Sequence, residues 1–340
     1  MASMMALSLT ACGGNGSSAT TAADTSAADT KAEGTTAAAP ADKIGLAGSG
    51  KELIFTTGGD QGTYYGFGSV LAGQISDMTD TTVTAIVGKG SKGNIEAMDA
   101  GDAQLGFVQS DVMAYAYNGT NLFDGAKVDG FSTVAALYME QVQIVTLNPD
   151  IKTVADLKGK TVSVGDSGSG VYFNALDCLG AYGLTIDDIT PTYQSFGDSV
   201  EAMQDGKIDA AFIVAGAPTT AVTSLAATRK VYLVELDDEH IDKLIEASPY
   251  YSKYTIAKDA YGLDADATTV AVGAVVVARD DVDENDIYNV VAGIYDSIDT
   301  LGHDKKNELD LDFAASVTAV PYHKGAAKYF AEKGLTVPTK

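Results

Sequence analysis

The feature that most constrains the fold is a loop type that recurs four times in the sequence. In each copy a short apolar run leads into a loop of small or polar residues, and a helical pattern follows. A helix start carries unpaired N–H groups and a partial positive charge, which suits an anionic ligand. The recurrence therefore predicts a binding cleft built largely from backbone. The four loops are residues 58–63, 109–111, 166–170 and 215–218.

One segment of the sequence, which leads into the second of these loops, recurs before the fourth loop. Glu96-Ala97-Met98 is followed by Gly101 and Phe107, and the same residue types recur 105 positions later, from Glu201 to Phe212. The constant offset predicts two similar lobes, each contributing two loops to one cleft, which is a common kind of small-molecule site. The alternative is a chance recurrence of residues that are frequent at helix ends.

Predicted strands alternate with helices from residue 51 onward, which favours an α/β fold with largely parallel sheets. We expect lobe one to hold residues 51–147 together with 260–340, and lobe two to hold residues 148–259. Near the first crossover between the lobes, residues 133–138 and 143–147 are predicted to form two separate strands.

The N-terminal part of the chain has the character of an export signal followed by a tether. Leu9-Thr10-Ala11-Cys12 resembles a bacterial lipobox, so residues 1–12 are predicted to be a signal remnant with lipid carried on Cys12. The stretch before Cys12 is short and has no Lys or Arg, which indicates a truncated start. Residues 13–48 are rich in Ala, Ser, Thr and Gly and are predicted to be a disordered tether. The alternative is a disordered tail with a stray cysteine.

The charge of the chain argues against a nucleic-acid partner and limits how a carboxylate ligand can be bound. The chain has a net charge of −24, with 46 acidic and 22 basic residues. Nucleic-acid binding requires clustered Lys and Arg, so no nucleic-acid partner is expected. Arg229 and Arg279 are the two arginines of the sequence. A carboxylate ligand is therefore expected to bind to backbone N–H groups, hydroxyls or lysine rather than to a bidentate guanidinium.

Signals for catalysis and cofactors are weak. His240, His303 and His323 are isolated from one another and from cysteine, so no metal site is predicted. Cys178 falls on the apolar face of a predicted helix and is expected to be a buried structural thiol. The loop 165–170 does not complete a dinucleotide fingerprint. We expect no enzyme activity and no cofactor.

Several longer stretches between Glu52 and Gly334 carry a family pattern. The most diagnostic are Thr57-Gly58-Gly59 through Gly62-Thr63-Tyr64-Tyr65 and Val108-Gln109-Ser110-Asp111. Gly165 with Gly168-Ser169-Gly170, and Gly216-Ala217-Pro218-Thr219, also match. With these residues the chain resembles the TAXI class of solute receptors of TRAP transporters. One departure is that Asp60-Gln61 stands in the middle of the first loop, where the family usually has small residues.

The resemblance implies a type II periplasmic-binding-protein-like fold, with two α/β lobes, a hinge and a central ligand cleft. It implies an extracytoplasmic, monomeric receptor, lipid-anchored on the outer side of the cell membrane. The receptor would capture a small organic acid or amino acid, glutamate-like, and deliver it to TRAP membrane permease subunits. Two other functions stay open: a two-lobed α/β enzyme using a phosphate-containing substrate, and a ligand-binding module feeding a sensor kinase.

The resemblance also implies a set of ligand contacts. Asp60 is hypothesised to pair with an ammonium group of the ligand, the alternative being a solvent-facing turn residue. The full set of predicted contacts is Gly59, Asp60, Gln61, Gly62, Thr63, Tyr64, Gln109, Ser110, Tyr138, Ser167, Ser169, Gly170, Phe196, Ala215 and Gly216.

Overall fold

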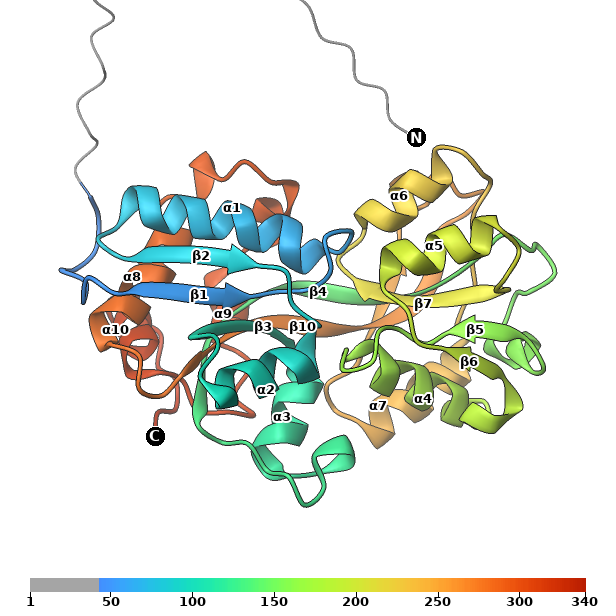
Figure 1. Cartoon of the computed structure of the whole chain (residues 1–340), viewed down its shortest axis with the longest axis horizontal. Coiled ribbons are helices and arrows are strands. Elements are labelled where there is room, and N and C mark those ends of the chain that lie inside the picture. The colour runs from blue at the N-terminus through green and yellow to red at the C-terminus, as the bar shows by residue number, and fades with distance from the viewer. Residues whose placement is uncertain (1–42) are drawn as a thin grey trace, which may run out of the picture. The chain divides into compact units, whose positions relative to one another are not determined.

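A ten-stranded mixed sheet runs through residues 43–340, which are the residues that the computed structural model describes (Figure 1). Two of the ten strands lie outside the main order: β8 (Tyr232–Leu233) pairs with β4, and β9 (Ser252–Ile256) pairs with β10. The main order is β2 (Thr82–Ile86), β1 (Glu52–Thr56), β3 (Leu105–Gln109), β10 (Ala267–Arg279), β4 (Phe131–Thr146), β7 (Ala210–Ala215), β5 (Thr161–Ser163) and β6 (Thr190–Thr192).

The two halves of the sheet have the same strand order. In one half β1 pairs in parallel with β2 and β3, and in the other β5 pairs in parallel with β6 and β7. The long strands β4 and β10 are antiparallel to each other and to their outer neighbours, β7 and β3. The predicted parallel sheets are thus present within each half, and an antiparallel pair of crossover strands joins them (Figure 1). This is the predicted two-lobed, type II arrangement.

Helices cover both faces of the sheet in the first lobe. One hydrophobic core joins the strands to α1 (Thr63–Met78), α8 (Glu284–Tyr295) and α10 (Lys324–Glu332). The other joins them to α2 (Ser91–Ala100) and α3 (Ser110–Asn118). The remaining short elements of this lobe are η1 (Asn121–Phe123), η5 (Ile298–Thr300), η6 (Asp304–Glu308) and α9 (Leu311–Ala314).

The second lobe is layered in the same way. Its strands pack on one face against α4 (Val171–Ala181) and α7 (Asp238–Ala247), and on the other against α5 (Phe196–Gln204) and α6 (Thr220–Ala226). Cys178 of α4 is a free, buried thiol in the first of these cores. Its short helices are η2 (Val154–Leu157), η3 (Ile186–Asp188) and η4 (Lys258–Ala260).

The boundaries between the lobes differ from the predicted ones. Tyr138 packs in the first lobe and Val142 in the second, so the first crossover lies inside β4. Val272 packs in the second lobe and Ala274 in the first, so the return lies inside β10. The predicted lobe boundaries, at residues 147/148 and 259/260, therefore differ from the crossover points in the structure. Two predicted strands are a single strand, β4, because its pairing with β10 continues through the polar residues between them.

The predicted tether ends earlier than expected. The N–H of Ile44 donates to the carbonyl of Met78 over 2.8 Å, and Leu46 packs against the core of the first lobe. Residues 43–48 are therefore part of the fold, which corrects the end of the predicted disordered segment at residue 48. The lipobox, Cys12 and the rest of the predicted tether lie outside the described residues.

The described helices do not provide a membrane-spanning segment. Within residues 43–340, none of them combines the length and the apolar character that crossing a bilayer requires.

Asn94 of α2 holds the ends of two neighbouring strands. Its Nδ2 donates to the carbonyls of Thr57 and Phe107 over 2.6 and 2.7 Å, and its Oδ1 accepts a hydrogen bond from the Thr56 hydroxyl. The side chain is fully buried. It therefore fixes where the loop after β1 leaves the sheet.

We predict that Asn94→Ala lowers the free energy of unfolding by about 2–3 kcal/mol, because two buried carbonyls lose their partner. Urea unfolding followed by circular dichroism measures this. Asn118→Ala, at the exposed end of α3, is the matched control and should change stability by less than about 0.5 kcal/mol. Equal effects of the two substitutions would contradict the assigned role of Asn94.

Candidate ligand-binding site

A cavity of about 80 Å³ lies between the two lobes, next to the point where β4 crosses from one to the other. The first lobe contributes the loop after β1, the loop before α2, the end of β3 and one residue of β4. The second lobe contributes the loop before α4, the start of α5 and the end of β7. Its wall consists of Gly58, Gly59, Asp60, Gln61, Gly62, Thr63, Tyr64, Gly88, Lys89, Gly90, Ser91, Gln109, Glu140, Asp166, Ser169, Gly170, Val171, Ser195, Phe196, Gly197, Val214 and Ala215.

Five helices, α1 to α5, begin at this wall, and four of them lack a side-chain cap. The N-cap residues of α1, α2, α3 and α4 are Gly62, Gly90, Gln109 and Gly170, and none of these accepts a side-chain capping hydrogen bond. Their first turns thus direct N–H groups and the positive ends of four helix dipoles toward one region. Such an arrangement binds negative charge without requiring an arginine.

Among the described residues 43–340, two buried polar atoms of wall residues have no hydrogen-bond partner. They are Oε1 of Gln109 and Oγ of Ser169, which come from opposite lobes. The other end of the Gln109 side chain is held, because its Nε2 donates to Oδ1 of Asn174 in α4 over 3.0 Å. Buried polar atoms are nearly always hydrogen-bonded in folded proteins, so these two atoms mark a place for a polar ligand.

A buried carboxyl closes the cavity on the side of the crossover strand. Glu140 of β4 is 2% exposed, and Tyr64 donates its hydroxyl to Glu140 Oε2 over 2.6 Å. Burial raises the pKa of Glu140 to about 8, and the hydrogen bond from Tyr64 offsets this only in part. Burial, followed by the charge of Glu140, also raises the pKa of Tyr64. The buried position of Glu140 in the unliganded protein therefore favours the neutral form of its carboxyl.

The two lobes touch each other on both sides of the cavity. The N–H of Gly93 in α2 donates to the carbonyl of Gly168 over 2.9 Å, and the N–H of Ala221 in α6 donates to the carbonyl of Gln61 over 3.2 Å. Gly170 lies so close to the Gln109 side chain that an added Cβ would come within 1.8 Å of Oε1. The structure therefore describes a closed arrangement of the lobes, with the cavity held between them.

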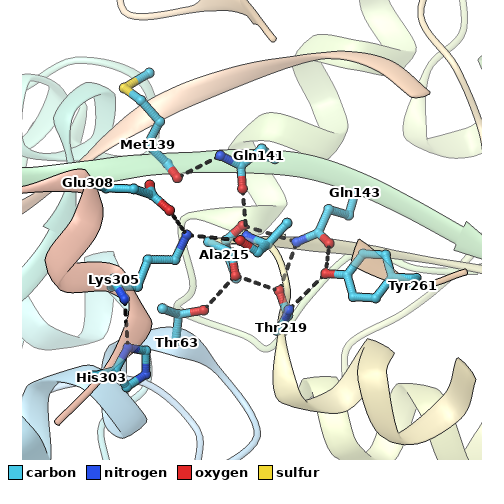
Figure 2. Close-up of polar contacts among 12 residues, drawn as sticks. Thr63, Met139, Gln141, Gln143, Ala215, Thr219, Tyr261, His303, Lys305 and Glu308 are labelled. Carbon is cyan, nitrogen blue, oxygen red and sulfur yellow. Dashed lines mark hydrogen bonds and ion pairs between the residues drawn. The ribbon is translucent and has the colours of Figure 1, made fainter. Parts of the chain in front are cut away.

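More polar contacts join the lobes beside β4 (Figure 2). Thr63 donates its hydroxyl to the carbonyl of Gly216 over 2.9 Å. Buried Lys305 of η6 donates to the carbonyl of Ala217 over 3.0 Å and forms an ion pair with Glu308. These contacts link the first-lobe segments α1 and η6 to the β7–α6 loop of the second lobe.

Eleven of the fifteen predicted contact residues line the cavity, and four do not. Ser110 is buried and accepts a hydrogen bond from the N–H of Gly273 in β10. Tyr138 packs in the core of the first lobe, and Gly216 presents its carbonyl to Thr63. Ser167 is exposed on its loop. These four residues lie outside the cavity wall, and ligand contact by the other eleven stays a prediction.

Sequence reasoning missed several wall residues. Residues 88–91 follow a strand and open a helix, which is the same pattern as the four recognised loops, so this signal was present in the sequence. Glu140 was missed because the polar residues around it suggested a break between two strands. Five other wall residues lie next to loops that the sequence pattern identified, but the contact between the two lobes decides which of their atoms face the cavity. They are Asp166, Val171, Ser195, Gly197 and Val214.

Comparison with known proteins assigns the family. The model of the NMT1-like family matches residues 55–334, which is most of the chain. The chain belongs to the NMT1-like family.

Individual proteins are similar to this chain in sequence or in structure. The chain is 43% identical over 70 residues to a putative aliphatic sulfonates-binding protein of Escherichia coli (strain K12), and this match spans 21% of this chain and 22% of that protein. A solved structure from Bordetella bronchiseptica RB50 matches with a TM-score of 0.50 and 16% identity, over 84% of this chain and 82% of that one. The periplasmic aliphatic sulphonate binding protein SsuA from Escherichia coli matches with a TM-score of 0.44 and 19% identity, over 84% and 94% of the chains.

The raised pKa of Glu140 predicts a pH-dependent stability of the unliganded protein. A carboxyl whose pKa is higher in the folded state stabilises the fold at low pH, and this contribution is lost as pH rises toward the folded value. For Glu140 the loss runs from about pH 4.5 to about pH 8. Each pH unit inside this window changes the contribution by at most about 1.4 kcal/mol.

We therefore expect Glu140→Gln to gain stability relative to the natural protein as pH rises from 5 to 8.5. Urea unfolding of ligand-free protein at several pH values measures the difference. Glu246→Gln, on an exposed position of α7, is the control and should keep the pH profile of the natural protein. A constant stability difference between Glu140→Gln and the natural protein would contradict the assignment.

Proposed function

We propose that this protein is the extracytoplasmic solute-binding receptor of a TRAP-type secondary transporter. It captures a small organic acid or amino acid, glutamate-like, between its lobes and delivers it to membrane permease subunits. Lipid on Cys12 holds it at the outer face of the cell membrane. The observation that carries the proposal is the closed cavity at which four uncapped helix starts meet the unpartnered atoms of Gln109 and Ser169.

Three further observations support solute capture. Membership of the NMT1-like family and the local match to a protein named as a sulfonates-binding protein agree with a transport role. The two crossover strands give the lobes a hinge about which a cleft can open and close. The wall holds no arginine, so an acidic group of the solute would rely on backbone N–H groups, hydroxyls or Lys89.

The TRAP assignment rests on the TAXI-like stretches around Gly58–Tyr65 and Val108–Asp111 in the sequence. It is tested by uptake into proteoliposomes that contain a TRAP permease from the same organism together with this receptor. Uptake driven by a sodium or proton gradient without ATP supports the proposal. Uptake that requires ATP hydrolysis would assign the receptor to a different transporter class.

Solute capture is tested directly by mass spectrometry of the compound that co-purifies with the protein, and by thermal shifts with a panel of amino acids, dicarboxylates and alkanesulfonates. A bound solute raises the melting temperature, because it binds the folded state only. If no member of the panel shifts the melting temperature and nothing co-purifies, the receptor function is wrong.

We predict that Ser169→Ala weakens binding of the best ligand of this panel by roughly 3- to 10-fold, because one hydrogen bond is lost without a change in shape. Isothermal titration calorimetry measures this. Ser167→Ala, two residues earlier on the same loop but exposed and outside the wall, is the matched control and should bind as the natural protein does. If the natural protein and both variants bind the ligand with equal affinity, Ser169 does not contact the ligand.

A further inference from the structure

Three acidic residues line the cavity, and they differ in burial. Asp60 is exposed at the rim, Asp166 is partly buried, and Glu140 is 2% exposed. Glu140 lies on β4 where the chain passes between the lobes, opposite Val272 of β10. One carboxyl oxygen accepts the hydrogen bond from Tyr64, and no hydrogen bond to the other oxygen is present among the described residues. The cavity wall therefore includes one buried carboxyl with a free acceptor.

We propose that Glu140 binds a positively charged ammonium group of the solute, so that the cavity selects a zwitterionic amino acid over a plain dicarboxylate or sulfonate. This inference rests on the proposed function and names the substrate class of the same site.

The first argument is the missing countercharge. Within residues 43–340, Glu140 forms no ion pair with a lysine, arginine or histidine. Lys305 acts on it from a distance, but its ammonium group is already bound to Glu308 and to the carbonyl of Ala217. Lys89 also lines the cavity but is exposed. Glu140 can ionise at low cost in this buried position only beside a cation, and an ammonium group of the ligand would supply that partner.

The second argument is the combination of charges around one small space. The starts of α1, α2 and α4 provide positive dipole ends, and Glu140 provides the negative group. An α-amino acid carries both a carboxylate and an ammonium group, and so it can satisfy both. A plain dicarboxylate and an alkanesulfonate carry no cationic group that could pair with ionised Glu140.

The same geometry predicts a proton linkage. The pKa of free Glu140 is about 8, and a bound ammonium group lowers it, so that ligand binding releases a proton at neutral pH. Affinity for the amino acid should therefore rise by up to about tenfold per pH unit between pH 6 and 8. The titratable and charged groups that face Glu140 or share the cavity with it are Tyr64 of α1, Asp111 of α3, Tyr138 of β4, Lys305 of η6, Lys89, Asp60 and Asp166.

The experiment is calorimetry with the twenty L-amino acids and the matching acids that lack the amino group, such as L-glutamate against glutarate. We expect one amino acid to bind and its analogue without the amino group to bind at least about 30-fold more weakly. Titration in two buffers of different ionisation enthalpy should show release of up to one proton at pH 7. Glu140→Gln should lose at least about 30-fold in affinity for the amino acid and should lose the proton release.

Variants separate the possible outcomes. Glu246→Gln on the exposed surface should bind as the natural protein does, and urea unfolding of Glu140→Gln confirms that it is folded. If Asp60→Asn loses affinity for the amino acid and proton release while Glu140→Gln keeps both, Asp60 binds the ammonium group and the inference is overturned. If glutarate or ethanesulfonate binds as tightly as any amino acid, the inference is overturned while solute capture stands. If no compound binds, both the inference about Glu140 and the proposed solute capture are wrong.

Discussion

The antiparallel pairing of β4 with β10 is the interaction on which the rest of the structure depends. Each strand begins in the core of one lobe and ends in the core of the other, so the pair forms the covalent and hydrogen-bonded connection between them. Glu140 and Val272 face each other near the centre of this pair. The position of the crossover therefore fixes one wall of the cavity, while the other walls come from loops whose distance depends on how far the lobes are closed.

The site combines two sources of charge that differ in origin. Its positive character comes from backbone, because Gly62, Gly90 and Gly170 precede helices without capping side chains. Its buried negative group comes from one side chain, Glu140, whose ionisation depends on what occupies the cavity. Backbone donors cannot lose their charge with pH, whereas a buried carboxyl can. The proposed anion binding and the proposed proton linkage thus have separate physical causes.

Much of the site could be predicted because its loops have local signals. Gly59, Gly62 and Gly170 were found from the strand–loop–helix pattern, and residues 88–91 carry the same pattern although it was overlooked. Ser110 shows the limit of this reasoning. It lies next to a wall residue, yet its hydroxyl accepts from Gly273 of a strand that is far away in the sequence. The direction of a side chain at a helix start depends on such distant partners.

The sequence by itself determined the alternation of strands and helices and three of the uncapped helix starts at the cavity, those of α1, α3 and α4, because each depends on residues close together in the chain. The tertiary structure alone decided where the lobes divide, which loops meet and that Glu140 is buried at their junction. A polar residue within an apolar stretch is compatible with either a strand break or a buried site. Only the pairing of β4 with β10 and the contact between the lobes exclude water from Glu140, and it is this desolvation that gives the residue its raised pKa.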